Sequence, residues 1–150
     1  MIILDTNVLS ALMRNEPDQP VLRWLDLQAA QSVWITSITL FESRIRLALL
    51  PAGRRRQTLE AAFDRLLEED LESRVLPFDT PAALQAASLA AARQQAGRPV
   101  DIRDTQIAGI AQARRATLAT RNVRHFEGLS VPVVNPWDRA LPARSGACGG

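Results

Sequence analysis

Short apolar segments alternate with longer amphipathic segments along this chain, and that alternation limits the possible folds more than any other feature. The short segments are rich in β-branched, aromatic or other apolar side chains and stop at polar or turn-forming residues, as buried strands do. They span residues 1–4, 33–36, 75–78, 117–120 and 131–134. Short strands separated by helices predict parallel strands joined by right-handed crossovers. We therefore predict an α/β fold with helices on both faces of one sheet.

The segments between these strands carry apolar or alanine-rich patterns at helical spacing. They predict helices over residues 6–13, 20–27, 39–50, 59–67 and 81–95, with a last one from residue 101. Each predicted helix begins next to a capping residue or a proline, or ends near a turn-forming residue.

The length of the chain predicts one domain. Its 150 residues, 47% of them hydrophobic, can bury a sizeable core without disulfide bonds. No apolar run approaches the roughly 18 residues that a membrane span needs, and the first residues lack the basic segment of a secretory signal. We therefore expect a cytoplasmic protein that does not enter a membrane, with residues 139–150 as a flexible tail.

Histidine and cysteine are too scarce for a zinc site. His125 is the one histidine, and Cys148 in the glycine-rich end is the one cysteine. Tetrahedral zinc sites take several nitrogen or sulfur ligands. Any bound metal must therefore be held by oxygen.

The basic residues are all arginine, with 18 Arg and no Lys, and the formal charge is +2. Arginine binds phosphate well, but exclusive use of arginine also follows from genomic base composition. The densest basic stretch is Arg54-Arg55-Arg56. It is either a phosphate-binding patch or the solvated start of a helix.

Polar side chains follow the predicted strands and begin the predicted helices. Asp5 ends the first strand, Glu42 lies near the start of the helix after the second, Asp104 lies near the start of a later helix, and Asn122 follows the fourth strand. Each acid alone is explained as a helix cap or a first-turn charge. Ligands of parallel sheets bind at the carboxyl ends of the strands, so these groups are expected to meet if the first, second and fourth strands are neighbours.

Three carboxylates at one sheet edge repel one another and raise each other's pKa, and a bound cation removes that repulsion. Mg²⁺ and Mn²⁺ prefer such oxygen ligands and lower the pKa of a bound water that can attack a phosphodiester. Asn122 is expected as a neutral ligand or to orient a water molecule. Thr6 and Ser37 are expected to hydrogen-bond to the ligands, and Asp101 is either an outer acid of the site or a helix cap.

The segments that carry these residues resemble the PIN-domain ribonucleases, and most closely the VapC-like toxins of the FitB-like branch. The resemblance covers about residues 1–138, the predicted nuclease domain. The matching motifs are Asp5-Thr6-Asn7, Ser37 to Glu42, Asp101 to Ala108 and Thr120 to Phe126, with further likeness at Leu50 to Arg56 and Val134 to Trp137.

This resemblance implies a three-layer α/β/α sandwich with a five-stranded parallel sheet. It implies a Mg²⁺- or Mn²⁺-dependent endoribonuclease that is the toxin of a type II toxin–antitoxin pair. Asp5, Glu42 and Asp104 are then the acidic ligands, and Asn122 is the fourth group of the site. His125 stands where the family usually has an acid, which leaves open whether one or two ions bind.

The same resemblance suggests three partners: an RNA substrate, a small DNA-binding antitoxin, and a second copy of the chain or a toxin–antitoxin hetero-oligomer. Arg121 and Arg54 are the candidate RNA contacts. Apolar faces around Trp24 and around residues 47–50 are candidate contacts for a protein partner.

Other functions fit the sequence less well. A phosphatase of the aspartyl-phosphate type needs an acid where Asn7 stands, and a Rossmann nucleotide-binding fold needs a glycine-rich turn that is missing. A catalytically silent binding module that pairs with a DNA-binding antitoxin remains the alternative. His125 is expected to be an exposed loop residue rather than a general acid, and the three Trp residues are expected in the core or an interface.

Overall fold

The computed structural model describes residues 1–138 and contains a sheet of five parallel strands. The strands are β1 (Ile2–Leu4), β2 (Val33–Thr36), β3 (Val75–Leu76), β4 (Thr117–Ala119) and β5 (Val133–Val134). They lie in the order β3-β2-β1-β4-β5, with β1 in the centre. The predicted α/β fold is confirmed. The tail predicted for residues 139–150, including Cys148, lies outside the described residues.

Four strands are shorter than predicted: β1 and β4 by one residue each, and β3 and β5 by two residues each. Only Val75 and Leu76 pair within residues 75–78, and only Val133 and Val134 pair within residues 131–134. Pro77 and Pro132 adjoin these pairs. Proline has no backbone N–H and cannot continue a hydrogen-bonded ladder, so the pairing is limited to two residues in β3 and in β5.

Within residues 1–138, six α-helices connect and cover the strands. They are α1 (Thr6–Leu12), α2 (Gln19–Asp26), α3 (Ser37–Leu49), α4 (Arg54–Arg65), α5 (Thr80–Gln95) and α6 (Ile102–Arg114). Short 3-10 turns form η1 (Ala30–Ser32) and η3 (Val123–Phe126), and a π-helical turn, η2 (Leu66–Asp70), extends α4. No helix within residues 1–138 is long and apolar enough to cross a membrane.

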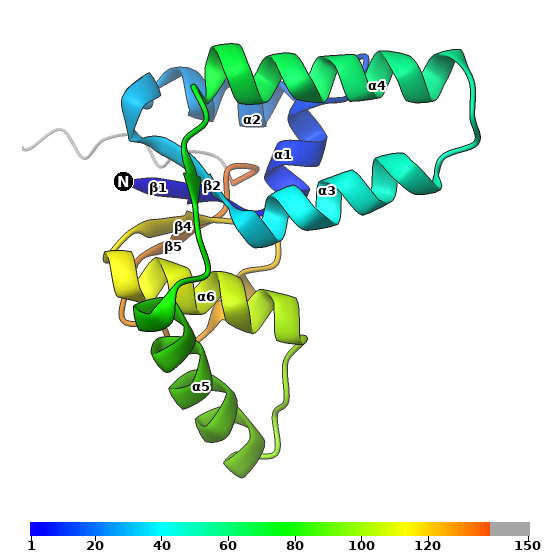
Figure 1. Ribbon diagram of the computed structural model, residues 1–150. Coiled ribbons are helices and arrows are strands. Elements are labelled where there is room, and N and C mark those ends of the chain that lie inside the picture. Colours follow the sequence, from blue (N-terminus) through cyan, green and yellow to red (C-terminus); the bar gives the residue numbers. More distant parts are fainter. Residues whose placement is uncertain (139–150) are drawn as a thin grey trace, which may run out of the picture.

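The sheet is covered on both faces, as a three-layer sandwich requires. Alternate residues of β1 point to opposite sides: Leu4 packs with the helices α1 to α4, and Ile3 packs with α5 and α6. Figure 1 shows the two layers, with α1, α2 and α4 above the strands and α5 and α6 below them. Trp24 packs on the first of these cores and Trp34 on the second, as predicted.

Side-chain caps fix where the helices beside the sheet begin. Asp5 accepts a hydrogen bond from the backbone of α1, and Thr36 accepts one from the backbone of α3. Both helices start directly after a strand, with no intervening loop longer than the cap itself. Residues in their first turns are therefore placed rigidly at the carboxyl edge of the sheet.

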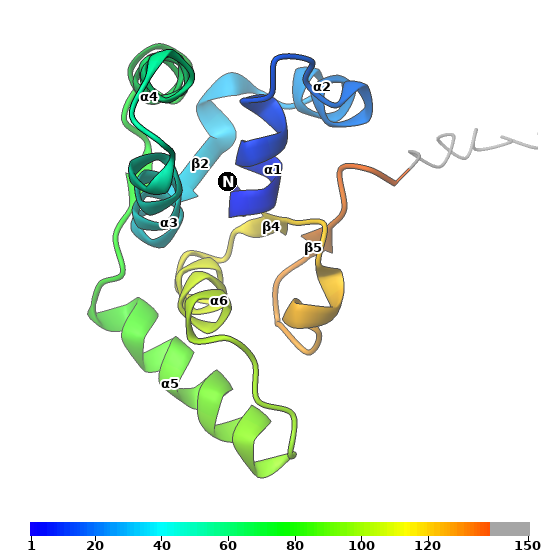
Figure 2. The same cartoon turned by 90° about the vertical axis from the view of Figure 1, so that its right-hand side faces the viewer.

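The helices α3 and α4 run side by side and extend beyond the sheet edge (Figures 1 and 2). Arg44 of α3 forms an ion pair with Asp64 of α4 at 2.6 Å, and its guanidinium lies 4.6 Å from the ring centre of Phe63. Phe63 is fully buried. These contacts hold α4 against α3 and leave a space between the pair and α1.

Candidate active site

The carboxyl ends of β1, β2 and β4 meet at one edge of the sheet, because β1 pairs with both of the others. Figure 2 looks onto this edge, with α1, α3 and α6 arranged around it. Asp5 follows β1, Glu42 lies in the second turn of α3, and Asp104 lies in the first turn of α6. The first, second and fourth strands are thus neighbours, which is the condition that the prediction of this site required.

Asp5 is the most enclosed acid of the site, with 4% of its surface exposed. Its Oδ1 accepts a hydrogen bond from the backbone N–H of Thr6 at 2.8 Å, and its Oδ2 accepts one from the hydroxyl of Thr120 at 2.8 Å. The side-chain amide of Asn7 also donates to Oδ2 at 3.3 Å. Asp5 is thus both a helix cap and a fixed oxygen donor at the sheet edge.

Burial raises the pKa of Asp5 from its ordinary value of 3.8 to about 6. The negative charges of Asp104 and Glu42 add to this rise, while hydrogen bonds from Thr120 and Thr6 oppose it. Electrostatic coupling of this kind requires the three carboxylates to be close. The structure therefore brings together the three acids that the sequence selected.

Glu42 is held from two sides. The hydroxyl of Thr6 donates to Oε1 at 3.3 Å, and the guanidinium of Arg103 lies 3.7 Å from Oε2. The side chain of Glu42 is 11% exposed. Thr6 thus lies where the sequence placed it, in contact with one of the acids.

Asp104 has a partner that the sequence did not indicate. Its Oδ2 lies 3.0 Å from Nδ1 of His125 in η3. His125 is 52% exposed, as expected for a loop residue, but it is not isolated from the site. The residue that replaces the family's usual acid contacts one of the three carboxylates.

The remaining predicted site residues, Asn122, Asp101 and Ser37, form hydrogen bonds with groups other than the three acids. Asn122 is exposed, and its backbone N–H donates to the hydroxyl of Thr120 at 3.1 Å. Asp101 caps α6 through the backbone N–H of Arg103 at 2.8 Å, so the capping alternative is the observed one. Ser37 does not serve the carboxylates as expected, because its hydroxyl accepts the backbone N–H of Phe78 at 3.2 Å and secures the chain after β3.

Thr120, Asn7 and Arg103 contact the acids but were not selected from the sequence. Thr120 is fully buried, and Asn7 donates to both Asp5 and Thr120. The signal for Thr120 was present, since a polar residue ends the apolar fourth strand, one position before Arg121. Arg103 gave no comparable signal, because an arginine in the first turn of a helix reads as a solvated charge.

The donor set fits a hard divalent cation. All three acids present carboxylate oxygens, and their mutual repulsion is the kind that a cation relieves. As the side chains lie in residues 1–138, no group of three or more His, Cys, Asp or Glu is arranged so that it could hold a metal ion. The acids instead contact Thr6, Thr120, Arg103 and His125. Such an open arrangement suits Mg²⁺, which keeps several of its waters and binds few carboxylates directly.

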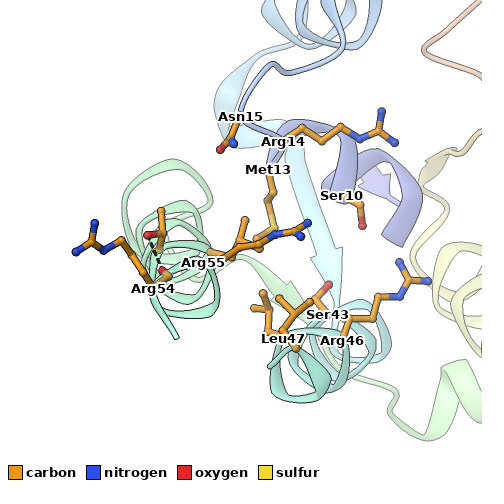
Figure 3. A pocket seen from close by; sticks show the side chains of 12 residues that line it. Ser10, Met13, Arg14, Asn15, Ser43, Arg46, Leu47, Arg54 and Arg55 are labelled. Atoms are coloured by element: carbon orange, nitrogen blue, oxygen red, sulfur yellow. Dashed lines mark hydrogen bonds between the residues drawn. The ribbon is translucent and has the colours of Figure 1, made fainter. Parts of the chain in front are cut away.

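A groove of about 640 Å³ lies between α1, α3 and α4, and none of the three acids lines it. Its lining combines the apolar side chains of Met13, Leu47, Leu50 and Leu59 with those of four arginines: Arg14, Arg46, Arg54 and Arg55. Figure 3 shows Arg54 and Arg55 on the α4 side and Ser10 and Arg46 on the opposite side. Arg54, a predicted RNA contact, thus lines this groove and not the edge that carries the carboxylates.

Comparisons with known proteins find relatives that match nearly the whole chain. The PIN domain family model matches residues 2–130. The chain is 39% identical to VapC ribonuclease Y4jK of Sinorhizobium fredii over 140 residues, which cover 93% of this chain and 100% of the relative. It is 34% identical to toxin FitB of Neisseria gonorrhoeae, with 91% and 99% of the two chains covered.

Solved structures agree with the fold. One chain in the structure of FitAB bound to an IR36 DNA fragment superposes with a TM-score of 0.86, at 33% identity, with 95% of this chain and 99% of that chain covered. A chain in DNA-bound VapBC from Salmonella typhimurium superposes with a TM-score of 0.73, at 29% identity, with 90% and 97% covered.

Proposed function

The chain belongs to the PIN domain family, and we propose that it is a metal-dependent endoribonuclease, the toxin of a type II toxin–antitoxin pair. The full-length identity to a VapC ribonuclease and to toxin FitB supports this assignment. One structural observation carries it: Asp5, Glu42 and Asp104 come from three separate segments and meet at the carboxyl edge of the sheet, close enough to raise the pKa of Asp5.

Asp5, Glu42 and Asp104 would hold the Mg²⁺ or Mn²⁺. When bound, the ion supplies a Lewis acid beside the scissile phosphate and lowers the pKa of the attacking water. Thr120 and Asn7 keep the Asp5 carboxylate oriented, and Thr6 does the same for Glu42. Preset carboxylates need no rearrangement when charge develops on the substrate, which is how such sites accelerate phosphodiester cleavage.

Two further side chains contact the acids of the site. Arg103 faces Glu42, and His125 faces Asp104. Both are about half exposed, so each can turn toward solvent when a cation takes its place beside the carboxylate. We propose that Asn122, which is exposed and bound to Thr120 through its backbone, orients a water molecule or a substrate hydroxyl.

Growth arrest is the test of the toxin assignment. Inducing the chain alone in bacteria should stop growth and produce RNA fragments with new, mappable ends. The double variant Asp5→Asn, Asp104→Asn should accumulate to the same level without stopping growth, because two of the proposed ligands lose their charge. Harmless expression of the folded wild-type chain would count against the assignment.

We further propose that the groove between α1, α3 and α4 receives a segment of the antitoxin. An apolar floor with arginines around it fits a peptide that carries both apolar and acidic side chains. In the described part of the chain, Arg46, Arg54 and Arg55 have no carboxylate within ion-pair distance. Two of the similar solved structures, FitAB and VapBC, are complexes bound to DNA, in keeping with a DNA-binding partner.

A catalytically silent module would bind the same partner, so partner binding does not separate the two functions. The acids do. A binding module has no need for three repelling carboxylates, one of them buried at a free-energy cost. We therefore favour the nuclease, acting on RNA in the cytoplasm.

A further inference from the structure

Arg121 lies beside the acids in a position that the proposed site does not use. It follows Thr120, whose hydroxyl binds Asp5, and its backbone N–H donates to the side-chain oxygen of Asn7 at 3.2 Å. Asn7 in turn donates to Asp5. The backbone of Arg121 is therefore tied to the same hydrogen-bond network that orients the Asp5 carboxylate.

The side chain of Arg121 is held by an aromatic ring. Its guanidinium carbon lies 4.9 Å from the ring centre of Trp137, the geometry of a cation–π contact. In Figure 2 the chain after β5 rises beside α1 toward α2, which brings the segment of Trp137 to this side of the site. Stacking occupies a face of the guanidinium and leaves its N–H edges free.

Trp137 is itself fixed in place. Its indole N–H donates to Oδ2 of Asp18 at 3.0 Å, and its backbone N–H donates to Oδ1 of Asn135 at 3.0 Å. Asp18 stands at the cap position of α2 but makes no side-chain cap bond there, so its carboxylate is available to the indole. Two segments distant in sequence, one at Asp18 and one at Asn135 to Trp137, thus cooperate to orient Arg121.

The guanidinium of Arg121 has no acidic partner among residues 1–138. An exposed arginine usually samples many rotamers, but the Arg121 side chain is stacked on Trp137, and its backbone lies beside the carboxylates that are proposed to cut a phosphodiester. Free N–H edges of a planar guanidinium bind phosphate oxygens in pairs.

We propose that Arg121, oriented by Trp137, clamps a backbone phosphate of the RNA next to the cleaved bond, and that Trp137 is a positioning residue. This inference rests on the proposed ribonuclease function. Arg121 would contact a phosphate and no base, so it would position the RNA strand without selecting its sequence.

Steady-state cleavage of a fluorescein-labelled single-stranded RNA, with the salt dependence of KM, tests the clamp. Arg121→Gln should raise KM about tenfold or more, the effect of losing a charge-assisted bond, and lower the slope of log KM against log salt by about 0.7, the value for one phosphate contact on a single strand. Trp137→Leu should raise KM about three- to tenfold, the value of a cation–π contact. The double variant should be no worse than Arg121→Gln, because both changes remove the same contact.

The matched control is Arg124→Gln, since Arg124 is also exposed and lies in η3 without a cation–π partner among the described residues. It should change KM less than Arg121→Gln does. Trp137→Phe keeps an aromatic face, so its KM should stay close to the wild-type value. It replaces Trp137→Leu if that variant fails to fold. Equal effects at Arg121 and Arg124, or effects of Arg121 and Trp137 that multiply, would overturn the clamp. If only the clamp is wrong, the wild-type chain still cleaves RNA. If the wild-type chain cleaves no RNA, the proposed ribonuclease function is wrong.

Discussion

Asp5 combines two roles that a sequence reader would treat as alternatives. One carboxylate oxygen caps α1 and the other is bound by Thr120, while the whole group is nearly buried. A hydrogen-bonded cap would ordinarily lower the pKa of an acid, but here burial is the larger effect and raises it to about 6. The hydrogen bonds therefore fix the position of the Asp5 carboxyl group, whereas burial disfavours its charged form.

This balance predicts a pH dependence of stability in EDTA. The folded chain holds its Asp5 proton up to about pH 6, and the unfolded chain loses it near 3.8. The contribution of Asp5 to the free energy of unfolding is fully present below about pH 4 and is lost as the pH rises through 6. Urea titrations should show a loss on the order of 3 kcal/mol that is absent from Asp5→Asn.

The matched control for this titration is Asp26→Asn, because Asp26 is exposed on α2. That variant should follow the wild-type curve between pH 4 and 7. If Asp5→Asn follows the wild-type curve as well, the burial argument for Asp5 is wrong.

Single residues also mark the limit of prediction from the sequence. Asp5, Glu42 and Asp104 were found because acids at strand and helix ends of an α/β sheet share one edge. The contact between His125 and Asp104 joins residues 21 positions apart, and that between Thr120 and Asp5 joins residues 115 apart. Nothing in local pattern or spacing specifies such pairs, so the groups that orient the acids had to come from the structure.

At the scale of elements, the pairing of α5 with α6 depends on Gly109. A Cβ built at Gly109 would lie 2.6 Å from the carbonyl oxygen of Ala82 and 2.7 Å from the Cβ of Ala86. In the sequence this glycine only weakens a predicted helix. The structure gives its role: the missing side chain at Gly109 lets the backbone of α5 pack directly against α6.

Gly109→Ala is therefore expected to destabilise the protein, although alanine favours a helix. Overpacking against backbone atoms should cost about 1 to 3 kcal/mol in the free energy of unfolding. Ala87→Gly on the exposed side of α5 isolates helix propensity alone and should cost up to about 1 kcal/mol. Thermal or urea unfolding measures both, and a Gly109→Ala protein more stable than wild type would contradict the close packing of α5 and α6.

The elements themselves were largely predictable. Strand positions and helix starts followed from apolar runs and caps such as Asp5 and Asp79. One error lies at α4, which begins at Arg54 and not near residue 59. The others lie mainly at β3 and β5, where apolar side chains adjoin a proline but pairing is limited to two residues. Hydrophobicity reports burial, whereas pairing also needs backbone N–H groups.

At the scale of the whole molecule, the sequence predicted a parallel sheet but not the groove. The groove is assembled from α1, α3 and α4, and its arginines come from three separate stretches. In the sequence, Arg54 to Arg56 look like one basic cluster. The structure separates them, because Arg56 forms an ion pair with Glu60 at 2.8 Å while Arg54 and Arg55 line the groove.

Reversing charge in the groove should weaken the antitoxin complex. Arg46→Glu combined with Arg55→Glu places acids where an acidic peptide is expected, so the proposed antitoxin, when expressed together with the chain, should co-purify less and protect cells less well. Arg23→Glu on the exposed part of α2 is the control. Undiminished capture of the partner by the groove variant would show that the partner docks elsewhere.

The central claim is that Asp5, Glu42 and Asp104 hold a cation used to cut RNA, and cleavage by the purified chain tests it most directly. A labelled RNA should remain intact in excess EDTA and be cut when Mg²⁺ or Mn²⁺ is restored. Asp5→Asn combined with Asp104→Asn should abolish cleavage while the protein stays folded. Full activity in EDTA, or unchanged cleavage by the double variant, would contradict the account.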